Sequence, residues 1–344
     1  MSCHPGMRVV LSRLLTSLGV AALLSASLSA CNILDPKPPV ELVTPEPEPA
    51  INQADQALSR AEALKRQGML DKAREEFEKA IAINPNLTVA YLGAGDIYRE
   101  QGDYRNAESR YSRAAQIEPG NFDAQYLHGL TLQLLNRLGE AVRAYLRALT
   151  IRPDDFSANL NLATAYLQLG EPAQALPYAQ RAVKIDTTSG PARTNLGSVY
   201  AALGRHSEAV SEYQQASELA DLTPPLLLNL ADSLGKIGRY EEMVNTLTRL
   251  LELQPSAAGF ERLGSAQFRL RKYPEAETAF RKSIELDPGY FPALNGVAVC
   301  CLNRYVWSDK TDEAARTEAV DLFRRSLAID KRQPKIIELL SRYQ

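Results

Sequence analysis

The sequence predicts an all-α protein, a solenoid of about eight helix–turn–helix units that ends in a capping helix. The first observation is a period of 34 residues, in which Ala107 is followed in register by Ala141, Ala175 and Ala209 and then by Met243. The second is the order inside each unit, where two apolar stripes of helical spacing are separated by a glycine and usually followed by a proline. A period of this length indicates stacked supersecondary units that share one continuous core.

Residues 88–120, TVAYLGAGDIYREQGDYRNAESRYSRAAQIEPG, show the unit most completely. Gly95 and Tyr98 lie one helical turn apart, Gly102 interrupts the pattern, and Ala107 and Tyr111 belong to the second stripe. These residues and spacings resemble the tetratricopeptide repeat, and the resemblance covers about four-fifths of the chain. It implies a right-handed superhelix whose concave surface binds other proteins.

The predicted units run from residue 53 to residue 332 and depart from the pattern in three places. Pro177 falls inside the second helix of the fourth unit, where the loss of one backbone hydrogen bond predicts a bent or shortened helix. The seventh unit comes one residue early, which indicates a deletion in the loop before Ala257. The last unit carries an insertion at about 302–316 that is expected to form a long turn. Residues 333–344 are expected to form the amphipathic capping helix that the last unit of a stack requires.

Residues 1–30 differ from the repeats and are expected to be a lipoprotein signal peptide. Arg8 and Arg13 precede an apolar run that is short for a membrane-spanning helix. The run ends in the sequence LSAC, which resembles the lipobox of bacterial lipoproteins and implies lipid attachment at Cys31. A plain cleaved signal and a signal anchor stay open as alternatives, and Met7 is a second candidate start.

Residues 31–52 are expected to form the lipidated cysteine and a proline-rich spacer. Prolines are frequent between residues 35 and 50, which disfavours a helix and favours an extended chain. Asn32 follows the cysteine, where the resemblance associates aspartate with retention in the inner membrane. The expected location is therefore the bacterial cell envelope, as an outer-membrane lipoprotein that faces the periplasm.

The composition and motifs contain no sign of an enzyme. The chain has 39 Lys and Arg against 41 Asp and Glu, so it lacks the basic excess that indicates a nucleic-acid partner. It has no glycine-rich phosphate loop, no histidine pair at metal-binding spacing and no serine elbow, and we interpret His128 as a packed core residue. Cys300 and Cys301 are adjacent on a helix, where their side chains diverge and a disulfide is not expected. No cofactor, metal or small-molecule substrate is therefore expected.

One set of polar residues predicts a binding surface. Asn161, Asn195 and Asn229 hold the same place in three consecutive units, each just before a leucine. The resemblance adds that such asparagine ladders on the concave surface bind the backbone of an extended peptide, and an amide supplies both a donor and an acceptor. The alternative is that asparagine is simply common at this place in idealised repeats.

The corresponding groove positions are mostly apolar. They are Leu58, Leu92, Tyr126, Leu160 and Leu228. Such a groove favours an amphipathic helix or a hydrophobic peptide as the ligand. The charged pattern with which some members of the family clamp a chaperone's C-terminal carboxylate is absent.

The insertion contains Tyr305 and Trp307, the latter the only tryptophan of the chain. Aromatic residues are favoured anchors at interfaces, so we expect a second, smaller contact site there. The competing interpretation is that Trp307 folds back over the end of the stack, beside Ile336 and Leu339.

These observations lead to one functional expectation and one alternative. The chain is expected to be a membrane-anchored scaffold that binds proteins, as extended peptides or amphipathic helices, and helps to assemble a pilus, secretion or cell-wall complex. The alternative is a non-catalytic subunit that recruits an envelope hydrolase or glycosyltransferase.

Overall fold

The computed structural model describes residues 50–344, so the predicted signal peptide, Cys31 and most of the predicted spacer lie outside the described residues. Within this part the chain forms 17 α-helices and no strand, which confirms the all-α prediction. None of the described helices is both long and apolar enough to cross a bilayer.

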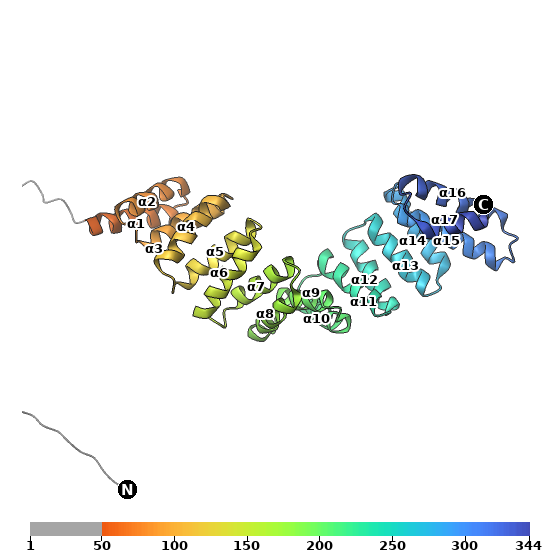
Figure 1. The fold of residues 1–344 in the computed structure, drawn as a ribbon, viewed down its shortest axis with the longest axis horizontal. Coiled ribbons are helices and arrows are strands. Elements are labelled where there is room, and N and C mark those ends of the chain that lie inside the picture. The colour runs from red at the N-terminus through yellow and green to blue at the C-terminus, as the bar shows by residue number, and fades with distance from the viewer. Residues whose placement is uncertain (1–49) are drawn as a thin grey trace, which may run out of the picture. The chain divides into compact units, whose positions relative to one another are not determined.

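The helices form eight consecutive pairs and a single last helix. Each odd-numbered helix packs against the helix that follows it, and each even-numbered helix packs against the helix after it (Figure 1). The pairs are α1 (Ala50–Arg66) and α2 (Leu70–Ile83), α3 (Thr88–Glu100) and α4 (Tyr104–Ile117), α5 (Phe122–Leu134) and α6 (Leu138–Ile151), α7 (Phe156–Gln168) and α8 (Pro172–Ile185), α9 (Gly190–Ala202) and α10 (His206–Leu219), α11 (Pro224–Lys236) and α12 (Tyr240–Leu253), α13 (Ala257–Arg269) and α14 (Tyr273–Leu286), and α15 (Phe291–Trp307) and α16 (Glu313–Ile329).

The turn inside each of the first seven pairs has one residue in the left-handed backbone conformation. Asn136 and Arg271 take this place in two turns, with φ of 57° and 62°. In the other five turns it belongs to glycine, which adopts positive φ without steric cost: Gly68, Gly102, Gly170, Gly204 and Gly238. A backbone bond such as that from the Asp103 nitrogen to the Tyr98 oxygen, at 2.8 Å, closes each turn.

The two helices of a pair cross closely where the first carries a glycine and the second an aromatic ring. A Cβ atom built at Gly129 would lie 2.8 Å from Cδ1 of Tyr145, too close for carbon atoms. The ring of Tyr145 is fully buried and fills the space that the glycine leaves. The same relation recurs at Gly95 and Tyr111, at Gly197 and Tyr213, and at Gly264 and Phe280.

Two departures from the repeat lie where they were predicted, but the proline in the fourth unit does not shorten its helix. Three residues connect α12 to α13, one fewer than connect α10 to α11, which confirms the deletion before Ala257. Pro177 lies inside α8, yet α8 has 14 residues, the same length as α6, so the helix is not shortened. The proline removes a single hydrogen bond, while the buried Ala175, Ala179 and Ala182 keep the rest of α8 packed.

The insertion at 302–316 is not the long turn that the sequence predicts. α15 and α16 have 17 residues each, against 13 and 14 in the preceding pair, and only residues 308–312 connect them. The extra residues continue the helices because the apolar spacing continues, with Leu302, Tyr305 and Ala315 buried. The last helix, α17 (Pro334–Tyr343), covers the end of this pair with Ile336 and Leu339, in the place predicted for a cap.

Candidate functional site

The odd-numbered helices line the inner side of the repeat stack. α7 contacts α9 and α9 contacts α11, so helices two apart in sequence lie side by side on this face. No even-numbered helix of the described chain makes a comparable contact with the next even-numbered one. The stack is therefore tighter along its odd-numbered helices, and the predicted groove residues lie on these helices.

The three predicted asparagines meet in one hollow of about 820 Å³. Asn161 comes from α7, Asn195 from α9 and Asn229 from α11, and Leu160 lines the same hollow. Asp221 is the only charged residue in its described lining. The spacing of one unit thus places three amides in a partly apolar groove that contains a single carboxylate. We call this hollow the amide groove.

Hydrogen bonds inside the protein hold two of these amides in fixed orientations. Asn161 Nδ2 donates to the hydroxyl of Tyr126 at 3.0 Å, and Asn195 Nδ2 donates to Thr164 Oγ1 at 2.9 Å. The Thr164 hydroxyl donates in turn to the Leu160 carbonyl at 2.9 Å. The Oδ1 atom of Asn195 is buried and accepts no hydrogen bond within the described chain. Because this atom is buried, its unused hydrogen-bonding capacity is not open to a ligand in this conformation.

The other predicted groove residues are only partly available. Leu92 and Leu228 are half-buried and pack against core clusters, and Tyr126 stacks on Phe122 with ring centroids 5.7 Å apart. Of the predicted apolar positions, the structure brings only Leu160 into the amide groove. The apolar positions thus contribute to the packing between units as well as to the surface.

A second hollow, also of about 820 Å³, lies further along the stack and was missed in the sequence analysis. Residues of α11, α13 and α15 form most of its lining, including Lys236, Glu261, Phe268, Arg269 and Asn295. Two glycines in its lining, Gly235 and Gly296, face Met243 and Phe280. These two glycines were the feature of the sequence from which the hollow could have been predicted. They resemble the small residues that the repeat carries elsewhere, so they did not indicate a hollow.

The structure separates the two predicted aromatic contacts. Tyr305 is 8% exposed and packs edge-on against Tyr343 of α17, so it is a core residue, and the prediction that it makes partner contacts is wrong. Trp307 is 66% exposed, and its ring meets the ring of Tyr273 edge-on at 4.8 Å. The competing placement of Trp307 beside Ile336 and Leu339 is not what the structure shows. Tyr305, and not Trp307, packs in the same core cluster as Ile336 and Leu339, because Tyr305 lies on the buried stripe of α15.

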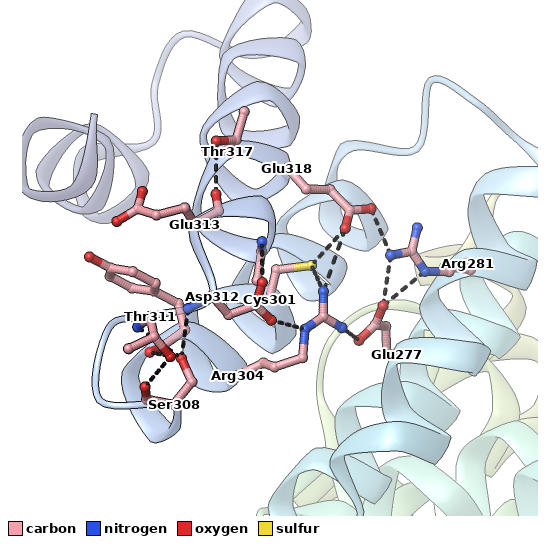
Figure 2. A network of polar contacts seen from close by, with 12 residues as sticks. Glu277, Arg281, Cys301, Arg304, Ser308, Thr311, Asp312, Glu313, Thr317 and Glu318 are labelled. Atoms are coloured by element: carbon pink, nitrogen blue, oxygen red, sulfur yellow. Dashed lines mark hydrogen bonds and ion pairs between the residues drawn. The ribbon is translucent and has the colours of Figure 1, made fainter.

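An ion-pair network joins α14, α15 and α16 around Arg304 (Figure 2). Arg304 pairs with Glu277 at 3.2 Å and with Asp312 at 3.1 Å, and Arg281 bridges Glu277 and Glu318 at 2.7 and 2.6 Å. Partial burial opposes the charge of Arg281, but hydrogen bonds to Glu318 and Glu277 raise its pKa. The network holds the lengthened pair α15 and α16 against α14.

The cysteines and histidines do not form a reactive site. Burial raises the pKa of Cys300 and of Cys301 to about 12, so both thiols stay protonated near neutral pH. His128 is half-buried with Nε2 3.1 Å from Glu108, and burial lowers its pKa in spite of that carboxylate. No group of three or more potential metal ligands occurs in the described part of the chain.

Comparison with known proteins identifies the repeat. Models described as "Tetratricopeptide repeat" match residues 64–130, 154–222 and 228–291, and a model described as "TPR repeat" matches residues 134–170. Together they cover more than half of the chain. The chain belongs to the tetratricopeptide repeat family. Members of this family are in general non-catalytic scaffolds that bind other proteins, so the repeat region is a protein-interaction module with protein partners.

Solved tetratricopeptide repeat structures share the fold at low sequence identity. The C-terminal part of a TPR repeat-containing protein from Cytophaga hutchinsonii is 16% identical with a TM-score of 0.57, covering 71% of this chain and 97% of that one. YrrB, described as a TPR protein with an unusual peptide-binding site, is 19% identical with a TM-score of 0.50, covering 58% of this chain and 98% of that one. At these identities the likeness shows the fold alone.

The curated relatives match over a short segment. The protein O-mannosyl-transferase TMTC1 of mouse and of human is 34% identical over 61 residues, 18% of this chain. The match spans only 6% of the mouse protein and 7% of the human protein. It therefore reflects shared tetratricopeptide repeats, and the transferase activity of the relatives is not carried over to this chain.

Proposed function

We propose that this chain is a membrane-anchored scaffold of the bacterial envelope that binds peptide segments of its partners in the amide groove and helps to assemble a pilus, secretion or cell-wall complex. The observation that carries the binding proposal is the meeting of Asn161, Asn195 and Asn229 in one hollow beside Leu160. The expected ligand is an extended peptide or an amphipathic helix. The description of YrrB as a peptide-binding TPR protein supports this class of ligand.

The chemistry of the amide groove favours a sequence-tolerant grip on a peptide backbone. An extended peptide offers alternating N–H and C=O groups, and a side-chain amide pairs with either. Because Asn161 and Asn195 are already oriented by Tyr126 and Thr164, little side-chain entropy is lost on binding.

The binding proposal is tested by replacing all three asparagines with alanine. At about 0.5–1.5 kcal/mol for each lost hydrogen bond, the triple variant should bind a peptide selected from an array about ten-fold more weakly or worse. The matched control replaces Gln116 and Gln215, an exposed and a half-buried amide of α4 and α10, whose side chains donate to a serine one turn earlier. Equal affinity of wild type and triple variant, with unchanged helical circular dichroism, would assign the asparagines to packing alone.

The envelope part of the proposal is supported by the sequence, through the lipobox-like motif at Cys31 and the proline-rich segment after it. The several acyl chains of a bacterial lipoprotein anchor a protein far more stably than a single chain does. Cys31→Ser should release the protein from the membrane fraction, and mass spectrometry should find lipid on the wild-type N-terminus. A variant that stays in the membrane fraction, or an unmodified wild-type terminus, would contradict the anchor and leave the binding proposal untouched.

A further inference from the structure

A second surface adjoins the hollow between α11, α13 and α15. Phe268 lines this hollow, and its ring meets the ring of Tyr273 edge-on at 5.0 Å. Tyr273 in turn meets Trp307 at 4.8 Å. The three rings therefore form a continuous aromatic path from the hollow to the exposed indole of Trp307.

Positive charges that are free of ion pairs accompany this path. Lys236 and Arg269 line the hollow, and Arg271 and Lys272 directly precede Tyr273. All four are exposed, and none forms an ion pair within the described chain. Elsewhere on the stack the turn arginines are neutralised, as where Arg239 pairs with Glu242 at 2.5 Å. We call the three rings and these four cations the aromatic–basic surface.

Arg271 occupies a backbone position that suits glycine. Its φ is 62°, whereas five of the other six equivalent turns carry glycine with φ near 75°. A side chain in this conformation strains the backbone, so the fold itself gains nothing from an arginine here. Arginine in place of glycine therefore adds a positive charge to the turn that precedes Tyr273, although the backbone conformation of this turn favours glycine.

We infer that the aromatic–basic surface binds an acidic peptide segment that carries an aromatic or large aliphatic side chain. The side chain enters the hollow beside Phe268, and carboxylates of the peptide pair with Lys236, Arg269 and Arg271. This site deepens the proposed scaffold function by adding a sequence-selective contact to the tolerant amide groove. It also supplies the ligand class for the contact predicted at Trp307.

A peptide fits this surface better than an anionic membrane does. The apolar groups lie in a hollow between helices, which admits a protruding side chain, whereas a bilayer presents a flat face. Asp232 and Glu261 both line the same hollow, Asp232 paired with Arg262 at 3.4 Å, and Asp309 is exposed two residues after Trp307. These carboxylates oppose a broad negative surface, while a peptide can direct its own charges away from them.

The test uses the full chain and a short fluorescein-labelled peptide of glutamate, serine and phenylalanine, measured by fluorescence anisotropy. Two matched peptides replace the phenylalanines by serine or the glutamates by lysine. Trp307→Ala should weaken binding of the first peptide by about ten-fold or more, because a large exposed ring that a ligand covers is a frequent hot spot. Arg271→Gly should weaken it by about three-fold, with the difference shrinking at high salt.

Arg271→Gly separates binding from folding, because glycine suits this turn and the variant should be at least as stable as the wild type. The charge control is Arg105→Ala, because Arg105 is an exposed arginine of α4 that forms no ion pair with any described residue and is distant in sequence from Arg271. This control should leave the affinity unchanged.

Three outcomes would overturn the inference. The first is that the acidic aromatic peptide binds no more tightly than its two matched peptides. The second is that Trp307→Ala and Arg271→Gly leave the affinity for this peptide unchanged. The third is that these two variants lose binding to anionic vesicles but keep their affinity for the peptide. The asparagine variants test the amide groove separately. If only this probe fails, the scaffold proposal stands without its second site.

Discussion

Gly197→Ala should destabilise the fifth helix pair by crowding a buried tyrosine. A Cβ atom at this position would lie 2.7 Å from Cε1 of Tyr213, whose side chain is 1% exposed and donates to Ser198 Oγ at 3.1 Å. Overpacking of this kind costs about 1–3 kcal/mol. Alanine recovers about 1 kcal/mol of helix propensity, so the expected net loss is about 0–2 kcal/mol.

Two matched substitutions isolate the crowding. Gly139→Ala in α6 meets no atom within 4 Å and should be neutral or stabilising by up to about 1 kcal/mol. Gly204→Ala also meets open space but has φ of 74°, so it should cost about 1–2 kcal/mol through the backbone alone. Urea unfolding followed by circular dichroism at equal m-values measures all three.

The result that refutes this account is a Gly197→Ala variant no less stable than Gly139→Ala. A double-mutant cycle with Tyr213→Leu provides the second check, because the smaller side chain should remove most of the penalty of the alanine. If the penalty persists in that background, the close crossing of the two helices has another cause.

Three further outcomes are expected. Cys300 and Cys301 should resist thiol reagents until the protein unfolds, and rapid labelling of the native protein would contradict this. The free energy of unfolding should fall as pH rises from 9 toward 12, because the thiols ionise in the unfolded chain but stay neutral in the folded protein, where their pKa is raised to about 12. Arg304→Leu should cost up to about 1 kcal/mol, less in about 1 M salt, since the side chain is half exposed; a loss that salt leaves unchanged would show packing instead. The fluorescence of Trp307 should have the long emission wavelength of a solvent-exposed indole and be quenched by iodide, and Tyr305→Ala should destabilise the protein by about 3 kcal/mol. An indole that iodide does not quench would refute the placement of the two rings.

The repeat architecture was predictable because the residues that determine the structure of each unit lie within that unit. Glycine at positive φ, small residues at the helix crossing and apolar stripes at helical spacing all act within one unit of 34 residues. Asn161, Asn195 and Asn229 were likewise predictable as a row, since residues in register occupy equivalent places in a stack. The extent of the amide groove was not, because four of the five apolar groove positions also pack against core clusters.

Other features depend on contacts between units and required the tertiary structure. The Arg304 network joins residues from three helices and a loop, and nothing in the spacing of Glu277, Arg304 and Glu318 relates them. The exchange of roles between Tyr305 and Trp307 depends on which side of α15 faces α17.

By itself, the sequence determined the fold class, the helix pairs and the row of amides, because these follow from local backbone preferences and a fixed period. Only the tertiary structure decided the helical form of the insertion, the second hollow and the cations free of ion pairs beside it. One physical reason explains why these three features could not be predicted from the sequence. Burial, charge pairing and cavity shape are set by side chains that are distant in sequence and adjacent only after the units have stacked.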